Sequence, residues 1–270
     1  MVNRWRSRIR FLLLPIAALL LPLVIAPLGS SPFAAPAYAT ASALPVDTDV
    51  DYQLGGPGPV PKRVGIVVRD RQAAPLAGRY NVCYVNGFQT QPDERRFWRQ
   101  RKELVLHRDG RPVTDEAWGE WVLDIRTAEK RQRLARIVGR WTQRCASAGY
   151  DAVEFDNLDS FTRSRGMLTR AQALAFAEKL VRAAHRVGLA AGQKNLAGFD
   201  GTGIGYDFAV AEECGRYREC SAYIRSYGRQ VLAIEYRAAD FTRTCEQHGA
   251  ELAVVLRDLQ LRPDGVHRWC

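Results

Sequence analysis

The chain has 270 residues and a formal net charge of +10 at pH 7. Its lysines and arginines are scattered along the sequence instead of clustered, which excludes nucleic acid as the expected partner. We find no internal repeat and no interior low-complexity linker, so we expect one domain after an N-terminal targeting segment.

Residues 1–39 have the three parts of a secretory signal peptide. Four arginines precede the apolar run FLLLPIAALLLPLVIA, and the small residues at 37–39 (AYA) offer a cleavage site. Pro15 and Pro22 interrupt the run, which is shorter than the roughly 20 residues that span a bilayer. We therefore predict a secreted domain at 40–270 with no stable membrane association after cleavage. An uncleaved N-terminal anchor is the alternative.

The six cysteines all lie in the predicted mature part, at positions 83, 145, 214, 220, 245 and 270. An even number of cysteines in an exported chain indicates up to three disulfides. The spacing in CGRYREC predicts one pair, Cys214 with Cys220. The spacing of a Cys or Cys/His zinc site is absent from the sequence, so we predict no metal and no cofactor.

From Asn81 onward, short apolar runs alternate with helical patterns, which predicts βα units around a parallel sheet. Amphipathic helices are expected over 127–149 and 169–188, each ending at a glycine. Seven strands are expected in this part: NVCYVN (81–86), WVLDI (121–125), AVEFDN (152–157), LAAGQKN (189–195), FAVAEE (208–213), VLAIEY (231–236) and LAVVLRD (252–258).

Two further candidates, DYQLGG (51–56) and VGIVVRD (64–70), precede these with no room for a helix between them. Nine candidates exceed by one the eight places of a (β/α)8 barrel. We therefore predict an α/β protein with a single, disulfide-containing (β/α)8 TIM barrel, in which one of the first two candidates is accessory. An open doubly wound sheet is the alternative, although no G-x-G-x-x-G follows an early strand.

Carboxylates recur where the expected strands end. Side chains alternate between the two faces of a strand, so bulky neighbours packed against the helices would direct the acids into the barrel. This reasoning places Asp124, Glu154, Asp156 and Glu235 on the inward face. Single acids of this kind can instead cap the following helix or pair with a basic residue.

The residue types favour glycoside hydrolysis over other chemistries. All four histidines (107, 185, 248 and 267) lie away from the strand ends, and G-x-S-x-G is absent, which argues against metal-dependent and serine hydrolases. A pair of carboxylates is what a glycosidase uses, one ionised and one with a raised pKa. Aromatic side chains expected to stack on sugar rings are Tyr52, Tyr84, Trp118 and Tyr236.

The chain resembles glycoside hydrolase family 114, the endo-α-1,4-polygalactosaminidase family of secreted (β/α)8 enzymes, from about residue 51 to 270. The motifs that carry this resemblance are DYQLGG, CYVNGFQTQ, WVLDIR, DAVEFDNLDSF, GQKN, FAVAEECGRYREC and IEYR. In the family the catalytic pair lies at the ends of strands four and six. With NVCYVN as strand two, the resemblance implies Asp156 as nucleophile, Glu212 as acid/base and a retaining mechanism. The alternation of side-chain size favours Glu213 instead, which we keep as the alternate.

The resemblance further implies a cationic, partly deacetylated polysaccharide rich in α-1,4-galactosamine as the substrate. The candidate substrate-binding residues are Gln53, Tyr84, Asp124, Glu154, Asn157, Asp159, Lys194, Asn195, Glu235 and Tyr236. Among them, Asp124, Asp159 and Glu235 are the candidates for holding amines or hydroxyls. Two alternatives remain open at this point. One is a non-catalytic carbohydrate-binding barrel, and the other is a hydrolase of another amino-sugar matrix glycan.

Overall fold

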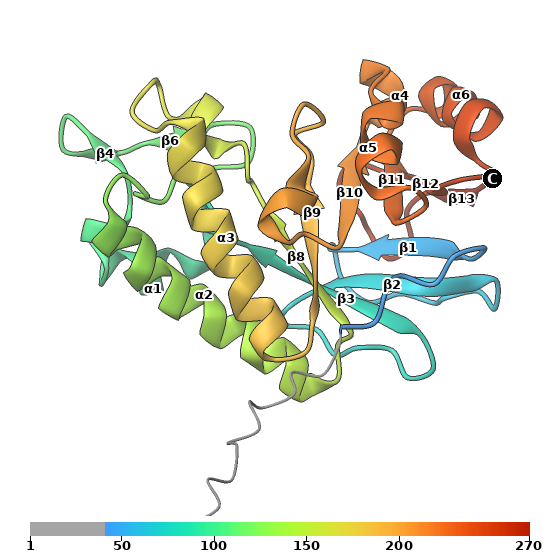
Figure 1. Cartoon of the computed structure of the whole chain (residues 1–270), viewed down its shortest axis with the longest axis horizontal. Coiled ribbons are helices and arrows are strands. Elements are labelled where there is room, and N and C mark those ends of the chain that lie inside the picture. The colour runs from blue at the N-terminus through green and yellow to red at the C-terminus, as the bar shows by residue number, and fades with distance from the viewer. Residues whose placement is uncertain (1–40) are drawn as a thin grey trace, which may run out of the picture. The chain divides into compact units, whose positions relative to one another are not determined.

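The structure is a computed structural model that describes residues 41–270, shown in Figure 1. The predicted signal peptide at 1–39 lies outside the described residues. Within residues 41–270, no helix is both long enough and apolar enough to cross a bilayer.

Eight parallel strands pair with one another in sequence order and form the barrel. They are β1 (Asp49–Gln53), β2 (Val64–Asp70), β3 (Tyr80–Asn86), β8 (Ala152–Asp156), β9 (Ala190–Lys194), β10 (Phe208–Glu212), β11 (Val231–Glu235) and β12 (Ala253–Arg257). A short strand, β13 (His267–Trp269), adds antiparallel to β12. Strands β1 and β12 lie side by side without a ladder, joined by Arg257 Nη1 to Asp51 Oδ1 at 3.1 Å. The barrel is therefore nearly closed, and the predicted fold class is confirmed.

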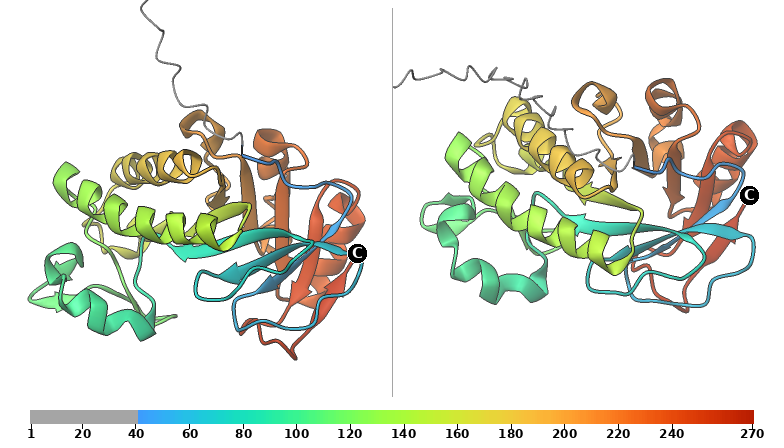
Figure 2. Two further views of the ribbon diagram at one scale, coloured as in Figure 1. Left: turned by 90° about the horizontal axis from the view of Figure 1, so that it is seen from below. Right: turned by 60° about the horizontal axis from the view of Figure 1, so that its bottom comes forward.

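Helices pack on the outside of the barrel between the later strands (Figure 2). They are α2 (Ala128–Ala148), α3 (Arg170–Arg186), α4 (Cys214–Tyr217), α5 (Cys220–Tyr227) and α6 (Ala238–His248). Thr127 caps α2 by accepting from the Lys130 N–H, and α2 ends at the left-handed Gly149. Thr169 and Gln172 form a capping box at the start of α3. The two long helices thus lie within the predicted ranges.

A long insert follows β3 and occupies residues 87–127. Its elements are η1 (Pro92–Glu94), α1 (Arg95–Arg99), η2 (Lys102–Leu104), the hairpin of β4 (His107–Arg108) with β5 (Arg111–Pro112), and the hairpin of β6 (Thr114–Asp115) with β7 (Glu120–Trp121). Two further 3-10 turns lie elsewhere, η3 (Ser160–Arg163) and η4 (Gly201–Ile204).

The insert overturns part of the predicted strand order. The prediction that WVLDI is a barrel strand was wrong, because Val122 and Leu123 make only isolated antiparallel bridges within the insert. These residues are apolar because they are buried in the core of the insert. Both upstream candidates, β1 and β2, are barrel strands, and NVCYVN is strand three instead of two. AVEFDN and FAVAEE remain strands four and six.

The lumen of the barrel is filled by side chains drawn from every parallel strand: bulky ones such as Tyr52, Phe208, Leu232 and Ile234, and the smaller Ala152 and Ala190 from β8 and β9. The alanines of β10 and β11, such as Ala209 and Ala233, face the helices. Gly192 on β9 leaves room for the Phe208 ring in the lumen, because a Cβ at position 192 would lie 2.5 Å from that ring. In this barrel, large side chains therefore mark the inward face of β10 and β11.

The residues that the structure describes contain three disulfides. Cys83–Cys145 links β3 to α2, Cys214–Cys220 links the starts of α4 and α5, and Cys245–Cys270 links α6 to the C-terminal residue. The predicted pair is confirmed. The other two pairs could not be chosen from the sequence, because six cysteines allow fifteen connectivities.

Candidate active site

A pocket of about 460 Å³ lies at the C-terminal ends of the barrel strands, which is where barrel enzymes carry their active sites. Its lining includes five acids and two basic residues: Asp115, Glu120, Asp156, Asp159, Glu212, Arg163 and Lys194. Of the residues predicted for the site, the lining brings together Tyr84, Asp156, Asn157, Asp159, Lys194, Asn195, Glu212 and Tyr236. The pocket is therefore acidic, although the whole chain is basic.

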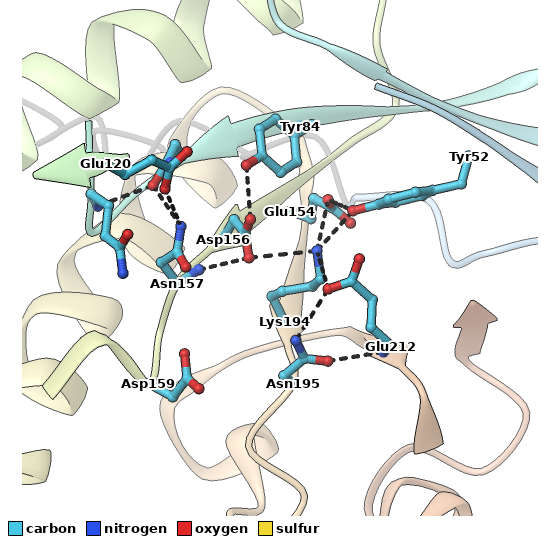
Figure 3. Close-up of polar contacts among 12 residues, drawn as sticks. Tyr52, Tyr84, Glu120, Glu154, Asp156, Asn157, Asp159, Lys194, Asn195 and Glu212 are labelled. Atoms are coloured by element: carbon cyan, nitrogen blue, oxygen red, sulfur yellow. Dashed lines mark hydrogen bonds and ion pairs between the residues drawn. The ribbon is translucent and has the colours of Figure 1, made fainter. Parts of the chain in front are cut away.

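Asp156 ends β8 with its side chain 18% exposed in the pocket. Three donors surround its carboxylate (Figure 3): Tyr84 Oη at 2.8 Å, the backbone N–H of the next residue, Asn157, at 2.7 Å, and Lys194 Nζ at 3.5 Å. Burial, and then the charge of Asp156, raise the pKa of Tyr84 well above its ordinary value, so this phenol remains a donor. The carboxylate of Asp156 is therefore held in place by three donors while it remains open to the pocket.

Glu212 ends β10, and its side chain is 25% exposed in the same pocket. Tyr236 Oη donates to its Oε1, and Asn195 Nδ2 and Lys194 Nζ lie 3.4 and 3.3 Å from Oε2. Burial, and then Glu212, raise the pKa of Tyr236 well above its ordinary value. Glu212 is thus held from three sides, as Asp156 is.

The side-chain-size argument for Glu213 was wrong. Phe208 and Val210 face the lumen, so Glu212 shares their inward face. Glu213 precedes α4 in a left-handed conformation, with φ of 56°, and pairs with Arg216 at 2.7 Å outside the pocket. The error arose because we assumed that bulky side chains face the helices, whereas this barrel packs them in its lumen.

Lys194 lies at the centre of the site, on β9 between the strands that carry the two acids (Figure 3). Its side chain is 2% exposed, and its Nζ lies within 4 Å of oxygens of Glu154, Asp156 and Glu212. Burial alone would lower the pKa of Lys194, but Asp156, Glu212 and Glu154 raise it well above its ordinary value. Lys194 is therefore a buried ammonium that compensates the charge of the acids around it.

Two asparagines shape the strand ends that position the acids. Asn157 follows β8 with φ of 67°, and Asn195 follows β9 with φ of 53°. Asparagine adopts this left-handed conformation more readily than other non-glycine residues. The turn at Asn195 lets its Oδ1 accept from the Glu212 N–H at 2.9 Å. Backbone of this kind clusters at functional sites.

Sequence reasoning missed the wall of the pocket that the insert and its contacts supply. Glu120 Oε2 accepts from Asn86 Nδ2 at 2.9 Å and from Asn157 Nδ2 at 3.2 Å. Arg163 pairs with Asp115 and Asp159, at 2.8 Å in each case. Only Asn86 carried a sequence signal, as the polar end of a strand. Glu120 lies in a two-residue strand whose position depends on how the whole insert folds.

Four of the predicted binding residues lie outside the pocket lining: Gln53, Asp124, Glu235 and Glu154. Gln53 faces outward, where it bonds Asp51 and Arg69. Asp124 pairs with Arg126 and Lys130 at the start of α2, because its segment belongs to the insert. Glu235 faces the helices and accepts from the Gly215 N–H at 2.7 Å, because the bulky residues of β11 face inward. These inward placements of Asp124 and Glu235 were wrong.

Glu154 was placed correctly on the inward face of β8, but it lies beneath the pocket and is fully buried. Tyr52 Oη donates to its Oε1 at 2.5 Å and itself accepts from Lys194 Nζ at 2.8 Å. Its other oxygen has no hydrogen-bond partner among the described residues. Burial raises the pKa of Glu154 to about 7, although Lys194 and Tyr52 oppose the shift.

Glu154 should make stability depend on pH. A carboxyl with a higher pKa in the folded protein binds more protons when folded, so its contribution favours folding at low pH. Here the contribution is complete below pH 4.5 and is lost as the pH rises through about 7. The shift corresponds to about 3 kcal/mol. We expect Glu154→Gln to lose less stability than the wild type between pH 5 and pH 8, measured by urea denaturation. Equal losses in the two proteins would contradict this assignment.

Among the described residues, one group of side chains lies close enough together to be considered as a metal site: Cys214, Cys220 and Glu235. Its two cysteines form a disulfide, so the group offers one carboxylate. The pocket itself presents carboxylates, amides and phenols without a histidine.

A nearly closed (β/α)8 barrel that presents two acids from strands four and six to one cleft has the architecture of a barrel glycosidase. The sequence model of Glycoside-hydrolase family GH114 matches residues 31–270. The chain belongs to this family and is a glycosidase, which confirms the predicted resemblance.

Solved structures agree in fold. The chain is similar to the crystal structure of Aspergillus fumigatus Ega3 in complex with galactosamine, with 24% identity, a TM-score of 0.69, and coverage of 87% of this chain and 100% of that one. It is also similar to the glycoside hydrolase domain of PelA from Pseudomonas aeruginosa, with 15% identity, a TM-score of 0.57, and coverage of 81% and 97%. A search of curated protein sequences found no match.

Proposed function

We propose that this protein is an exported, endo-acting glycosidase that cleaves an α-1,4-linked, galactosamine-rich polysaccharide. The observation that carries the proposal is the pair of carboxylates that faces one ammonium. Asp156 Oδ1 and Glu212 Oε2 lie 3.5 and 3.3 Å from Lys194 Nζ, so the two oxygens are no further apart than the sum of these distances. Both side chains are partly exposed to a pocket that can hold sugar.

The assignment of roles follows from the donors around each acid. Asp156 accepts from a backbone N–H and a phenol, which suits an ionised nucleophile that attacks the anomeric carbon. Glu212 would protonate the departing glycosidic oxygen and then take the proton from the water that releases the glycosyl enzyme. Lys194 lowers the cost of holding both negative charges at one site.

The substrate class is supported by charge and by the neighbouring structure solved with galactosamine. Five acids against two bases line the pocket, which favours a polymer bearing ammonium groups. The net positive charge of the chain opposes this weakly, because salt screens charges beyond about 8 Å. Trp118 and Leu259 line the same pocket and are 54% and 52% exposed, so they offer apolar surface for further sugar rings.

The three disulfides support export, since such bonds persist in oxidising compartments. The signal peptide expected at 1–39 would provide the route. Together these features support a secreted protein.

The function can be tested by incubating residues 40–270 with an α-1,4-galactosamine polymer and with chitosan, each with and without a chelator, and by identifying oligomers by mass spectrometry. We expect cleavage of the galactosamine polymer, unaffected by the chelator. Binding without cleavage would indicate a non-catalytic carbohydrate-binding barrel. Cleavage of chitosan alone would indicate another amino-sugar glycan, and loss of activity with the chelator would overturn the metal-free mechanism.

Two adjacent glutamates provide a matched pair of variants for the acid/base role. Glu212→Gln is expected to lower kcat roughly 10²- to 10⁴-fold, because a general acid contributes on that scale. Glu213→Gln makes the same chemical change one residue away, on a side chain that faces Arg216, and should keep kcat within about twofold. Steady-state kinetics on the galactosamine polymer checks both. A larger loss in Glu213→Gln would restore it as the acid/base.

A further inference from the structure

Glu120 differs from the other acids of the pocket in lacking a protein cation. Asp156 and Glu212 share Lys194, while Asp115 and Asp159 share Arg163. Within residues 41–270, no basic side chain lies within ion-pair distance of Glu120. Glu120 is nonetheless only 9% exposed. Burying a carboxylate without a counter-charge costs free energy, because the charge loses its hydration.

The carboxylate of Glu120 is held rigidly by its surroundings. Its Oε2 accepts from two asparagine amides, at 2.9 and 3.2 Å. In the amide orientation that satisfies both of its ends, Gln89 also donates to Oε2 at 3.0 Å and accepts from Arg163 Nε at 3.0 Å. All three donors reach the same oxygen. No hydrogen bond from the described residues reaches Oε1, and Glu120 lines the pocket.

Asn157 connects this carboxylate to the reacting group. Its backbone N–H donates to Asp156, at 2.7 Å, and its side-chain amide donates to Glu120, at 3.2 Å (Figure 3). A sugar bound against Asp156 would therefore have Glu120 as its neighbour on the insert side of the pocket.

We propose that Glu120 binds the free ammonium of an amino-sugar residue next to the scissile bond and thereby selects deacetylated over N-acetylated polymer. This inference rests on the proposed function and names the residue that recognises its substrate. The substrate ammonium supplies a positive charge next to Glu120, where the described residues place no basic side chain. Burial raises the pKa of Glu120 to about 7, and the charges of Asp156 and Asp115 act in the same direction.

The expected selectivity follows from the two substrate forms. An ammonium can donate a charge-assisted hydrogen bond to Oε1, whereas a neutral N-acetyl group brings no positive charge to pair with it. Hydrogen bonds to charged groups contribute enough to change affinity roughly ten- to hundredfold. Among the acids that we predicted to hold amines, Asp124 and Glu235 lie elsewhere, and Asp159 is already paired with Arg163.

The test is a binding measurement in the Asp156→Asn protein, which should bind without turnover. Calorimetry would compare an α-1,4-galactosamine tetramer with its fully N-acetylated form. Adding Glu120→Gln should raise the Kd of the tetramer ten- to hundredfold and leave that of the acetylated form within about twofold. Glu103→Gln makes the same change on an exposed residue of the same insert, and should alter neither Kd.

Equal losses for both tetramers, or no loss, would overturn the role of Glu120 while leaving the proposed function in place. Failure of the Asp156→Asn protein to bind either tetramer would overturn both. If the double variant does not fold, tetramers acetylated at a single position provide the second measurement. We expect one position at which a single acetyl group abolishes most of the affinity, and equal tolerance at all four would contradict the proposal.

Discussion

The Asp156→Asn variant should fold as the wild type does and lose about 10⁴-fold or more in kcat on the galactosamine polymer, the scale on which removal of a reacting group lowers the activity of hydrolases. The amide is close to isosteric with the carboxylate, and its one oxygen can still accept from the Asn157 N–H. Its NH2 takes the place of the oxygen that Tyr84 bonds, so the phenol must turn its hydroxyl and accept instead of donating. The amide is not a nucleophile, so no glycosyl enzyme can form. The measurement is polymer cleavage followed by mass spectrometry, with thermal unfolding as the check on folding.

The same variant tests whether Asp156 or a nearby acid is the nucleophile. Wild-type rates in Asp156→Asn would transfer the nucleophile to Glu154 or Asp159, which lie within three residues of it. Glu154 is buried beneath the pocket and bonded to Tyr52, and Asp159 is paired with Arg163, so neither is placed to attack. Nuclear magnetic resonance of the first product formed would show the α anomer for the retaining mechanism, and the β anomer would contradict it.

Replacing Lys194 with methionine should destabilise the protein by about 3–5 kcal/mol at pH 8, because removing one partner leaves buried charge without compensation. The carboxylates of Glu154, Asp156 and Glu212 all lie within 4 Å of its Nζ. At pH 5 the loss should be smaller, since Glu154, with its pKa of about 7, is then protonated. Urea denaturation at the two pH values measures both.

Two controls separate charge from packing in Lys194→Met. Lys62→Met makes the same substitution at an exposed lysine and should change stability by no more than a few tenths of a kcal/mol, as surface substitutions usually do. Combining Lys194→Met with Glu154→Gln removes one uncompensated acid, so it should recover part of the lost stability at pH 8. A loss that is equal at both pH values and not relieved by Glu154→Gln would indicate a packing defect.

The local sequence pattern predicted an element and its buried face correctly where the surroundings of that element were those of an average barrel. The helices α2 and α3, with Thr127 and Thr169 at their starts, could be predicted because capping and an apolar stripe depend on residues close together in the chain. The inward direction of Glu154 and Asp156 was readable because Val153 and Phe155 face the helices, as assumed. The same assumption failed for β10 and β11, whose bulky side chains face the lumen. On β10, Phe208 fits there because Gly192 of the neighbouring strand β9 leaves room for its ring.

The sequence by itself determined the family, the alternation that forms eight parallel strands, and the two carboxylates that end strands four and six. These depend on residues close together in the chain. Only the tertiary structure decided that Glu212 and not Glu213 faces the lumen, that Asp124 belongs to the insert, and that Glu120 reaches the pocket. The physical reason is that each of these depends on which side chains from distant strands share the space inside the barrel and at its mouth.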